Sequence, residues 1–265
     1  DRSSAASDVY KRQVFALGAT SGDLTEATTG ELTTDIVATQ LVFAALPTDV
    51  GATNGDVVSG TAFETQPVLQ AQDADGQIDT HFTDTLSLTT DAGGTLSGTT
   101  SLQATGGVAT FTDVTYTATQ DGQSFALVAA DQAGGSGGDL PDANSGDRIA
   151  DIVATRIAFA TLPADDRADN GDVVSGIAFA TQPLLQATDD NGQIDRDTAG
   201  SLTLEVSTGS VALIGTNAVA WSGGQVDFTS SGLGVTTAND GSVFALGATS
   251  GDPVSYTHLR AHETS

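Results

Sequence analysis

The chain has 265 residues, with 34 Asp and Glu against 8 Lys and Arg, a net charge of −26 and no cysteine. This charge argues against a nucleic-acid partner, because neutralising phosphates requires lysine and arginine. The lack of cysteine excludes disulfides, thiolate zinc sites and thiol catalysis.

The two ends differ in composition from the rest of the chain. The segments "SSAASDVYKRQ" and "VSYTHLRAHET" contain the only lysine and two of the three histidines. They resemble translated sequencing-adapter read-through, so we expect residues 1–13 and 253–265 to be an artefact. Residues 14–252 then carry 31 acids against four arginines, a net charge of −27.

Internal repetition predicts the domain organisation. The decapeptide "VFALGATSGD" occurs at 14–23 and at 243–252, and residues 35–89 align with 151–205 without a gap, with 33 of 55 positions identical. This offset of 116 residues predicts tandem repeats. We expect residues 14–34 to be the tail of a preceding repeat plus linker, 35–131 a repeat, 132–150 a linker and 151–252 a second repeat. Val14–Ala19 is then an orphan strand, disordered or docked on the edge of a neighbour.

Short alternating segments predict β-strands throughout. Apolar residues recur at every second position in "TLSLTT", "VATFT" and "SFALVAA", and Asn-Gly, Asp-Gly or Gly-Gly turns follow about every ten residues. The Gly-, Ser- and Asp-rich stretches 18–34 and 132–148 contain few large apolar residues and are expected to be semi-flexible tethers. The pattern predicts an all-β chain of antiparallel sandwiches.

A family resemblance agrees with this fold class. The segments "LVFAALPTD", "GVATFTDVTY" and "SFALVAAD" resemble the bacterial Ig-like repeats of large surface or secreted, adhesin-type proteins. The resemblance covers residues 39–131 nearly end to end and 155–249 less closely. It implies tandem Ig-like antiparallel β-sandwiches that act as spacer or adhesive modules, at the cell surface or outside the cell.

Two acidic turns are the candidate metal sites. "DADGQID" and "DDNGQID" place oxygen ligands at positions 1, 3 and 7 around a glycine turn, which suits a hard cation such as Ca²⁺. The alternative is a polar hairpin turn, for which Asp, Asn and Gly are also the preferred residues. A second hypothesis places an ion where the acidic loop 46–56 meets linker acids. The tentative calcium ligands are Asp73, Asp75, Asp79, Asp189, Asn191 and Asp195.

The residue inventory gives little support to catalysis or sugar stacking. His81 is the only histidine of residues 14–252, and the matching position in the second copy is Asp197, so no histidine triad recurs in both copies. Trp221 is the only tryptophan, read either as a core residue or as a ligand platform. We expect no enzyme, no catalytic residue and, since no apolar run reaches 18 residues, no membrane insertion in this segment.

The expected function is structural. The chain is interpreted as part of a stalk of tandem Ig-like repeats in a bacterial surface or secreted adhesin-like protein. Its partners are neighbouring repeats of the same chain, while a host, glycan or matrix ligand is bound through other domains. The alternative is a ligand- or glycan-binding accessory module of a secreted enzyme.

Overall fold

The computed structural model describes residues 14–19, 22–132, 134, 138–169 and 172–251, and these contain strands and turns but no helix. The all-β prediction is confirmed. Within the described ranges, no helix has the length and apolar character needed to cross a membrane. The terminal segments 1–13 and 253–265, expected to be artefact, lie outside the described residues.

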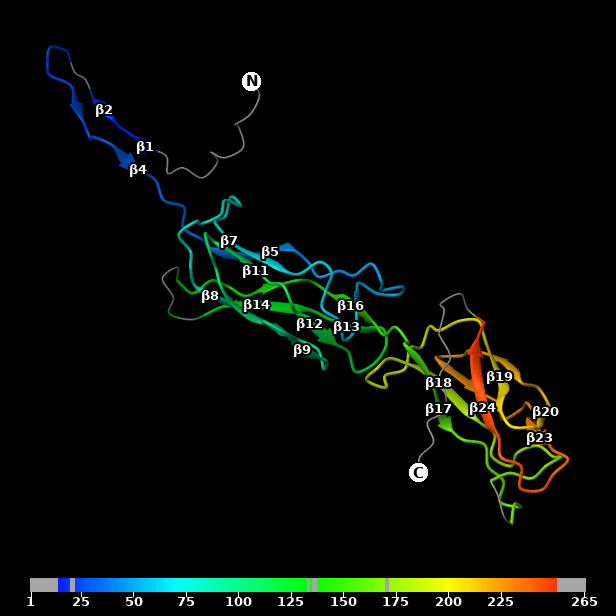
Figure 1. Ribbon diagram of the computed structural model, residues 1–265. Helices are drawn as coiled ribbons and strands as arrows, with labels where there is room; N and C mark the ends of the chain where they lie inside the picture. The colour runs from blue at the N-terminus through cyan, green and yellow to red at the C-terminus, as the bar shows by residue number, and fades with distance from the viewer. Residues whose placement is uncertain (1–13, 20–21, 133, 135–137, 170–171, 252–265) are drawn as a thin grey trace, which may run out of the picture. The chain divides into compact units, whose positions relative to one another are not determined.

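The chain divides into two compact units (Figure 1). Unit 1 comprises Asp1–Thr48, Ala62–Thr115 and Phe125–Asp147, and unit 2 comprises Asp49–Thr61, Tyr116–Ser124 and Arg148–Ser265. Segments 49–61 and 116–124, which precede the linker in sequence, therefore belong to unit 2. Each unit is described separately below.

Unit 1 is built on two antiparallel sheets. Strands β5, β7 and β11 form one in the order β11-β7-β5, and the other has the order β10-β8-β14-β15. Leu69 and Ala71 of the first sheet, and Leu86 and Leu88 of the second, alternate with more exposed neighbours and are buried. The bounds are β5 (Gln40–Ala45), β7 (Val68–Gln72), β8 (Thr85–Thr90), β9 (Thr95–Ser97), β10 (Ser101–Gln103), β11 (Val108–Thr110), β14 (Leu127–Asp131) and β15 (Ala143–Asn144).

The two main sheets of unit 2 have the strand orders of β5-β7-β11 and β10-β8-β14 in unit 1. Its sheets have the orders β17-β18-β22 and β21-β19-β24, and β20 pairs with β23. Residues of both three-stranded sheets, among them Leu185 and Leu204, share one buried cluster, which makes the unit a sandwich. The bounds are β17 (Arg156–Thr161), β18 (Leu184–Thr188), β19 (Ser201–Thr208), β20 (Ala212–Ile214), β21 (Ala218–Ala220), β22 (Gln225–Asp227), β23 (Gly234–Thr236) and β24 (Ala245–Ser250).

The correspondence between the units extends to an irregularity in the first strand. The β5–β7 register shifts between Phe43 and Ala45, and the β17–β18 register shifts between Phe159 and Thr161, at the same offset of 116. Phe43 and Phe159 are half-buried in both units. A bulge bends its strand and increases the local twist, so both units have the same bend at the same place.

A third sheet in unit 2 contains segments from before and after the linker. Its order is β13-β16-β6, and β6 pairs with β16 in parallel, with Val57 opposite Ala150. Both of these residues are fully buried. The segment 132–150, which the repeat boundaries predict to be a linker, thus contains β15 and most of β16. The bounds are β6 (Val57–Val58), β12 (Thr115–Thr117), β13 (Gln123–Phe125) and β16 (Arg148–Asp151).

The N-terminal described segment forms its own hairpin. Strand β1 (Val14–Phe15) pairs with β4 (Leu32–Thr33), and β2 (Gly18–Ala19) pairs with β3 (Ala27–Thr28). All eight residues are exposed. The prediction that Val14–Ala19 is disordered or docked on the edge of a neighbouring repeat is wrong, because residues 27–33 pair with it.

Candidate metal centre

Three aspartates of unit 2 converge although they are far apart in sequence. Asp121 lies in the turn after β12, Asp151 ends β16, and Asp197 follows the turn after β18. One carboxylate oxygen of each lies within 4.8 Å of the corresponding oxygens of the other two. Within the described ranges, these three side chains are close enough together to share one metal ion.

Asp151 is the buried member of the group. It is 1% exposed. Its Oδ2 accepts hydrogen bonds from the Thr53 amide at 2.6 Å, the Thr53 hydroxyl at 3.2 Å and the Asn54 amide at 3.5 Å. Its Oδ1 is buried and has no hydrogen-bond partner in the described part of the chain. Burying a carboxylate oxygen without a partner is costly.

Asp121 connects the turn to two other segments. Its Oδ1 accepts the amide of Ile152 at 2.9 Å, and its Oδ2 accepts the amide of Arg196 at 3.0 Å. The Gly122 amide also donates to the Ala150 carbonyl at 3.0 Å. Backbone donors therefore fix the orientation of this carboxylate.

The carboxylate of Asp197 has a raised pKa. The Asn54 side-chain amide donates to its Oδ2. A side-chain hydrogen bond with Asp195, then burial, and then the negative charges of Asp195, Asp151 and Asp121 raise the pKa of Asp197 from 3.8 to about 7. Negative charge is thus concentrated here, and a bound cation would relieve the repulsion.

The first sequence-predicted turn is closed by its own backbone. Asp73 Oδ1 accepts the amides of Asp75 at 3.0 Å and Gln77 at 2.8 Å, and Asp79 Oδ2 accepts the amide of Ala38 at 3.1 Å. Asp75 is exposed, whereas Asp79 is buried. The three-carboxylate group described above includes none of Asp73, Asp75 and Asp79.

The second predicted turn has the same hydrogen bonds. Asp189 Oδ1 accepts the amides of Asn191 at 2.9 Å and Gln193 at 2.7 Å, and Asp195 Oδ2 accepts the amide of Ala154 at 2.9 Å. These bonds are the ones that favour Asp and Asn in turns. Calcium binding by these residues stays a prediction.

Sequence reasoning missed the converging aspartates because it searched for ligands within short motifs. It expected an ion where the loop 46–56 meets an acid of the linker, whereas Thr53 and Asn54 of that loop contact Asp151, the first residue of the second repeat. The available signal was "DIVAT", whose first residue is Asp35 in one copy and Asp151 in the other.

The first copy has different chemistry at the matching positions. Asp35 corresponds to Asp151, and His81 corresponds to Asp197. His81 Nδ1 lies 3.4 Å from Asp35 Oδ1, and both side chains are more than half exposed. The second copy therefore has two carboxylates at these positions, whereas the first copy has a carboxylate and an imidazole.

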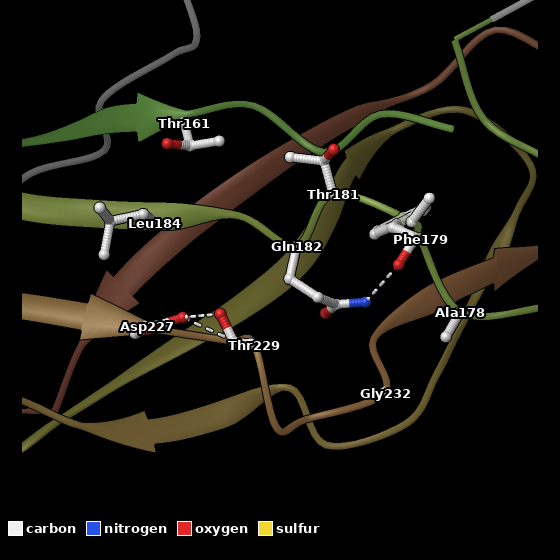
Figure 2. A pocket seen from close by; sticks show the side chains of 10 residues that line it. Thr161, Ala178, Phe179, Thr181, Gln182, Leu184, Asp227, Thr229 and Gly232 are labelled. Carbon is white, nitrogen blue, oxygen red and sulfur yellow. Dashed lines mark hydrogen bonds between the residues drawn. The ribbon is translucent and has the colours of Figure 1, made fainter. Parts of the chain in front are cut away.

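A surface hollow in unit 2 is the second candidate site (Figure 2). It has a volume of about 540 Å³ and lies where β17 and β22 end and β18 begins. Figure 2 shows the Gln182 amide turned to the Phe179 carbonyl, at 2.9 Å. A side-chain hydrogen bond from Thr229 holds the pKa of Asp227 below its usual value. Both polar groups therefore already have partners within the chain.

Trp221 does not offer a binding platform. It is 8% exposed and belongs to the buried cluster of unit 2. The core interpretation of this residue is confirmed.

A scan against protein-family models and a search of curated proteins each found no match to this chain. A functional assignment therefore rests on the sequence repetition and on the geometry given above.

Proposed function

We propose that the chain is a structural spacer, made of tandem Ig-like sandwiches, in the stalk of a bacterial cell-surface or secreted adhesin-like protein. The observation that carries this proposal is a recurrence in both units: the strand orders β5-β7-β11 and β10-β8-β14 recur as β17-β18-β22 and β21-β19-β24, with the same β-bulge. This recurrence follows a sequence duplication at an offset of 116 residues. A stalk that lengthens by adding units has this kind of internal duplication.

Two properties of the chain suit such a role. Unit 2 buries a cluster that contains residues of both its main sheets, so its stability has a local source. The net charge of −26 keeps neighbouring molecules apart by repulsion, which favours solubility at high local density. In this role the partners of the chain are neighbouring repeats, and the ligand is held by another domain.

The proposal is tested by measuring reach. One or two copies of the full chain are placed between a surface anchor and a binding domain of known ligand, and the distance at which ligand-coated beads are captured is measured. A spacer increases the capture distance with copy number and leaves the affinity of the binding domain unchanged. A capture distance that does not grow with copy number refutes the proposal.

The hollow of Figure 2 favours a second candidate, an accessory module that binds a glycan or another ligand. The test is binding of the full chain to a glycan library, with Thr181→Trp as the comparison. Thr181 is exposed and lines the hollow, so a tryptophan there fills it. Binding that Thr181→Trp abolishes supports the accessory module, and binding that is absent or unaffected by this change contradicts it.

A further inference from the structure

We propose that Asp121, Asp151 and Asp197 form a binding site for a hard divalent cation of the Ca²⁺ class. The site lies within unit 2 and differs from both acidic turns singled out in the sequence. The inference is independent of the spacer role, since it concerns the local chemistry of three side chains.

The spacing of the ligand atoms fits one ion. The three carboxylate oxygens lie within 4.8 Å of one another. Calcium–oxygen distances are about 2.3–2.6 Å, so two ligands on opposite sides of the ion are about 4.6–5.2 Å apart. The three carboxylates are therefore close enough together for a single Ca²⁺ to contact all of them.

The unpartnered oxygen of Asp151 is the independent observation. Asp151 is 1% exposed, and its Oδ2 already accepts donors from Thr53 and Asn54. Its Oδ1 is buried and without a hydrogen-bond partner in the described residues. Buried charged groups are normally paired or bound to a metal. A cation in contact with the neighbouring carboxylates supplies the partner that this oxygen lacks.

The protein holds the ligands in place before an ion arrives. Backbone amides of Ile152 and Arg196 orient Asp121, and the amide group of Asn54 donates to Asp197. An ionised carboxylate has about four acceptor positions, so each oxygen that accepts one amide can still coordinate a metal. Ca²⁺ takes 6–8 oxygens in flexible geometry, and the remaining positions can be filled by water.

The experiment is a calorimetric titration of Ca²⁺ alone into the full, chelator-treated chain, carried to about 10⁻³ M and above, the range of weak extracellular calcium modules. The variants are Asp121→Asn and Asp197→Asn, which remove one ligand charge each and keep the side-chain shape. We expect a site whose affinity falls at least about ten-fold in each variant.

Two control variants each remove one negative charge outside the proposed site. Asp166→Asn changes an exposed aspartate outside the cluster, and Asp75→Asn changes the exposed acid of the first predicted turn. Both are expected to bind Ca²⁺ as the unsubstituted chain does. Circular dichroism in chelator verifies the fold of every variant, and Asp197→Asn, at an exposed position, is decisive if Asp121→Asn fails to fold.

Three results would overturn the proposal. They are the absence of Ca²⁺ binding by the unsubstituted chain, an affinity that Asp121→Asn and Asp197→Asn leave unchanged, and a loss of binding in Asp75→Asn alone. The last result would place the ion at the first acidic turn.

Discussion

At the scale of single residues, one glutamine joins two segments in each unit. Gln182 donates from Nε2 to the carbonyls of Phe179 and Leu233, both at 2.9 Å, and its Oε1 accepts the Leu233 amide at 3.1 Å. Gln66, 116 residues earlier, makes the three equivalent bonds in unit 1. The side chain thus substitutes for a stretch of strand pairing that the backbone does not make.

Replacing this side chain is expected to destabilise the unit that contains it. Gln182→Ala removes three hydrogen bonds and should lower the free energy of unfolding of unit 2 by about 2–3 kcal/mol. Urea denaturation followed by the fluorescence of Trp221, the only tryptophan, measures the change. The control Thr181→Ala, at an exposed position of the same unit, should stay within about 0.5 kcal/mol. Equal effects of the two substitutions would show that the bonds of Gln182 do not stabilise the fold.

The carboxylate of Asp131 predicts a pH dependence of stability. Burial, followed by repulsion from Asp84 and Asp139, raises its pKa, while the amides of Leu140 and Gln132 oppose the shift. The folded chain binds the proton of the Asp131 carboxyl more tightly than the unfolded chain does. Protonation of Asp131 therefore stabilises the fold, and this contribution is complete below the ordinary pKa of 3.8. It is lost as the pH rises from 3.8 through the raised pKa.

Asp131→Asn should remove this contribution, since an amide does not titrate. Melting temperatures from pH 3 to pH 8 are measured by circular dichroism for both chains. We expect the variant to gain stability relative to the unsubstituted chain as the pH rises. Parallel profiles would contradict the assignment.

At the scale of elements, two turns contact each other closely in each unit. A Cβ atom added at Gly224 would lie 2.1 Å from the carbonyl oxygen of Asp195, and one at Gly107 would lie 2.3 Å from that of Asp79. Both glycines also have positive φ, of 73° and 76°. The Gly-Gly turn before β11 or β22 therefore fits against the end of the acidic turn only because it has no side chain.

The neighbouring glycine supplies a matched comparison. Gly223 has a φ of 58°, but a Cβ added there meets no atom within 4 Å. Gly223→Ala should cost about 1–2 kcal/mol, the penalty of the left-handed conformation. Gly224→Ala adds a backbone clash and should cost at least about 3 kcal/mol. Urea denaturation followed by Trp221 fluorescence gives both values, and similar costs would mean that the two turns separate without penalty.

The sequence predicted those elements whose cause is local. Alternation identified β8, where Leu86 and Leu88 are buried, and Asn-Gly and Asp-Gly pairs marked the turns. The repeat boundaries also predicted a linker over 132–150, yet Ala150 is fully buried opposite Val57. That pairing joins residues 93 positions apart, and no local pattern contains it.

The candidate site was less predictable for the same reason. The acidic turns are contiguous motifs, and their hydrogen bonds are those of ordinary turns. Asp121, Asp151 and Asp197 belong to three separate segments, so no contiguous motif contains them. Only the tertiary fold shows that their oxygens converge and that one of them is buried without a partner.

At the scale of the whole molecule, the net charge of −26 predicts a salt dependence. Repulsion between like charges is stronger in the compact state than in the unfolded chain, and salt screens it over about 10 Å at 0.1 M. In the presence of chelator, the melting temperature should therefore rise with NaCl and KCl equally. Asp166→Lys, at an exposed position, should raise it at low salt and have less effect at high salt. A melting temperature that is independent of salt would contradict this prediction.

The two copies of the decapeptide are identical in sequence, but their leucines lie in different environments. Leu17 of the N-terminal hairpin is 59% exposed, whereas Leu246, its counterpart in β24, is 7% exposed and packs in the core of unit 2. An antibody that recognises this leucine as part of its epitope should therefore bind the native chain once and the denatured chain twice. A rise from one to two bound antibodies per chain then shows that unit 2 has unfolded and exposed Leu246. This measurement needs no label on the protein.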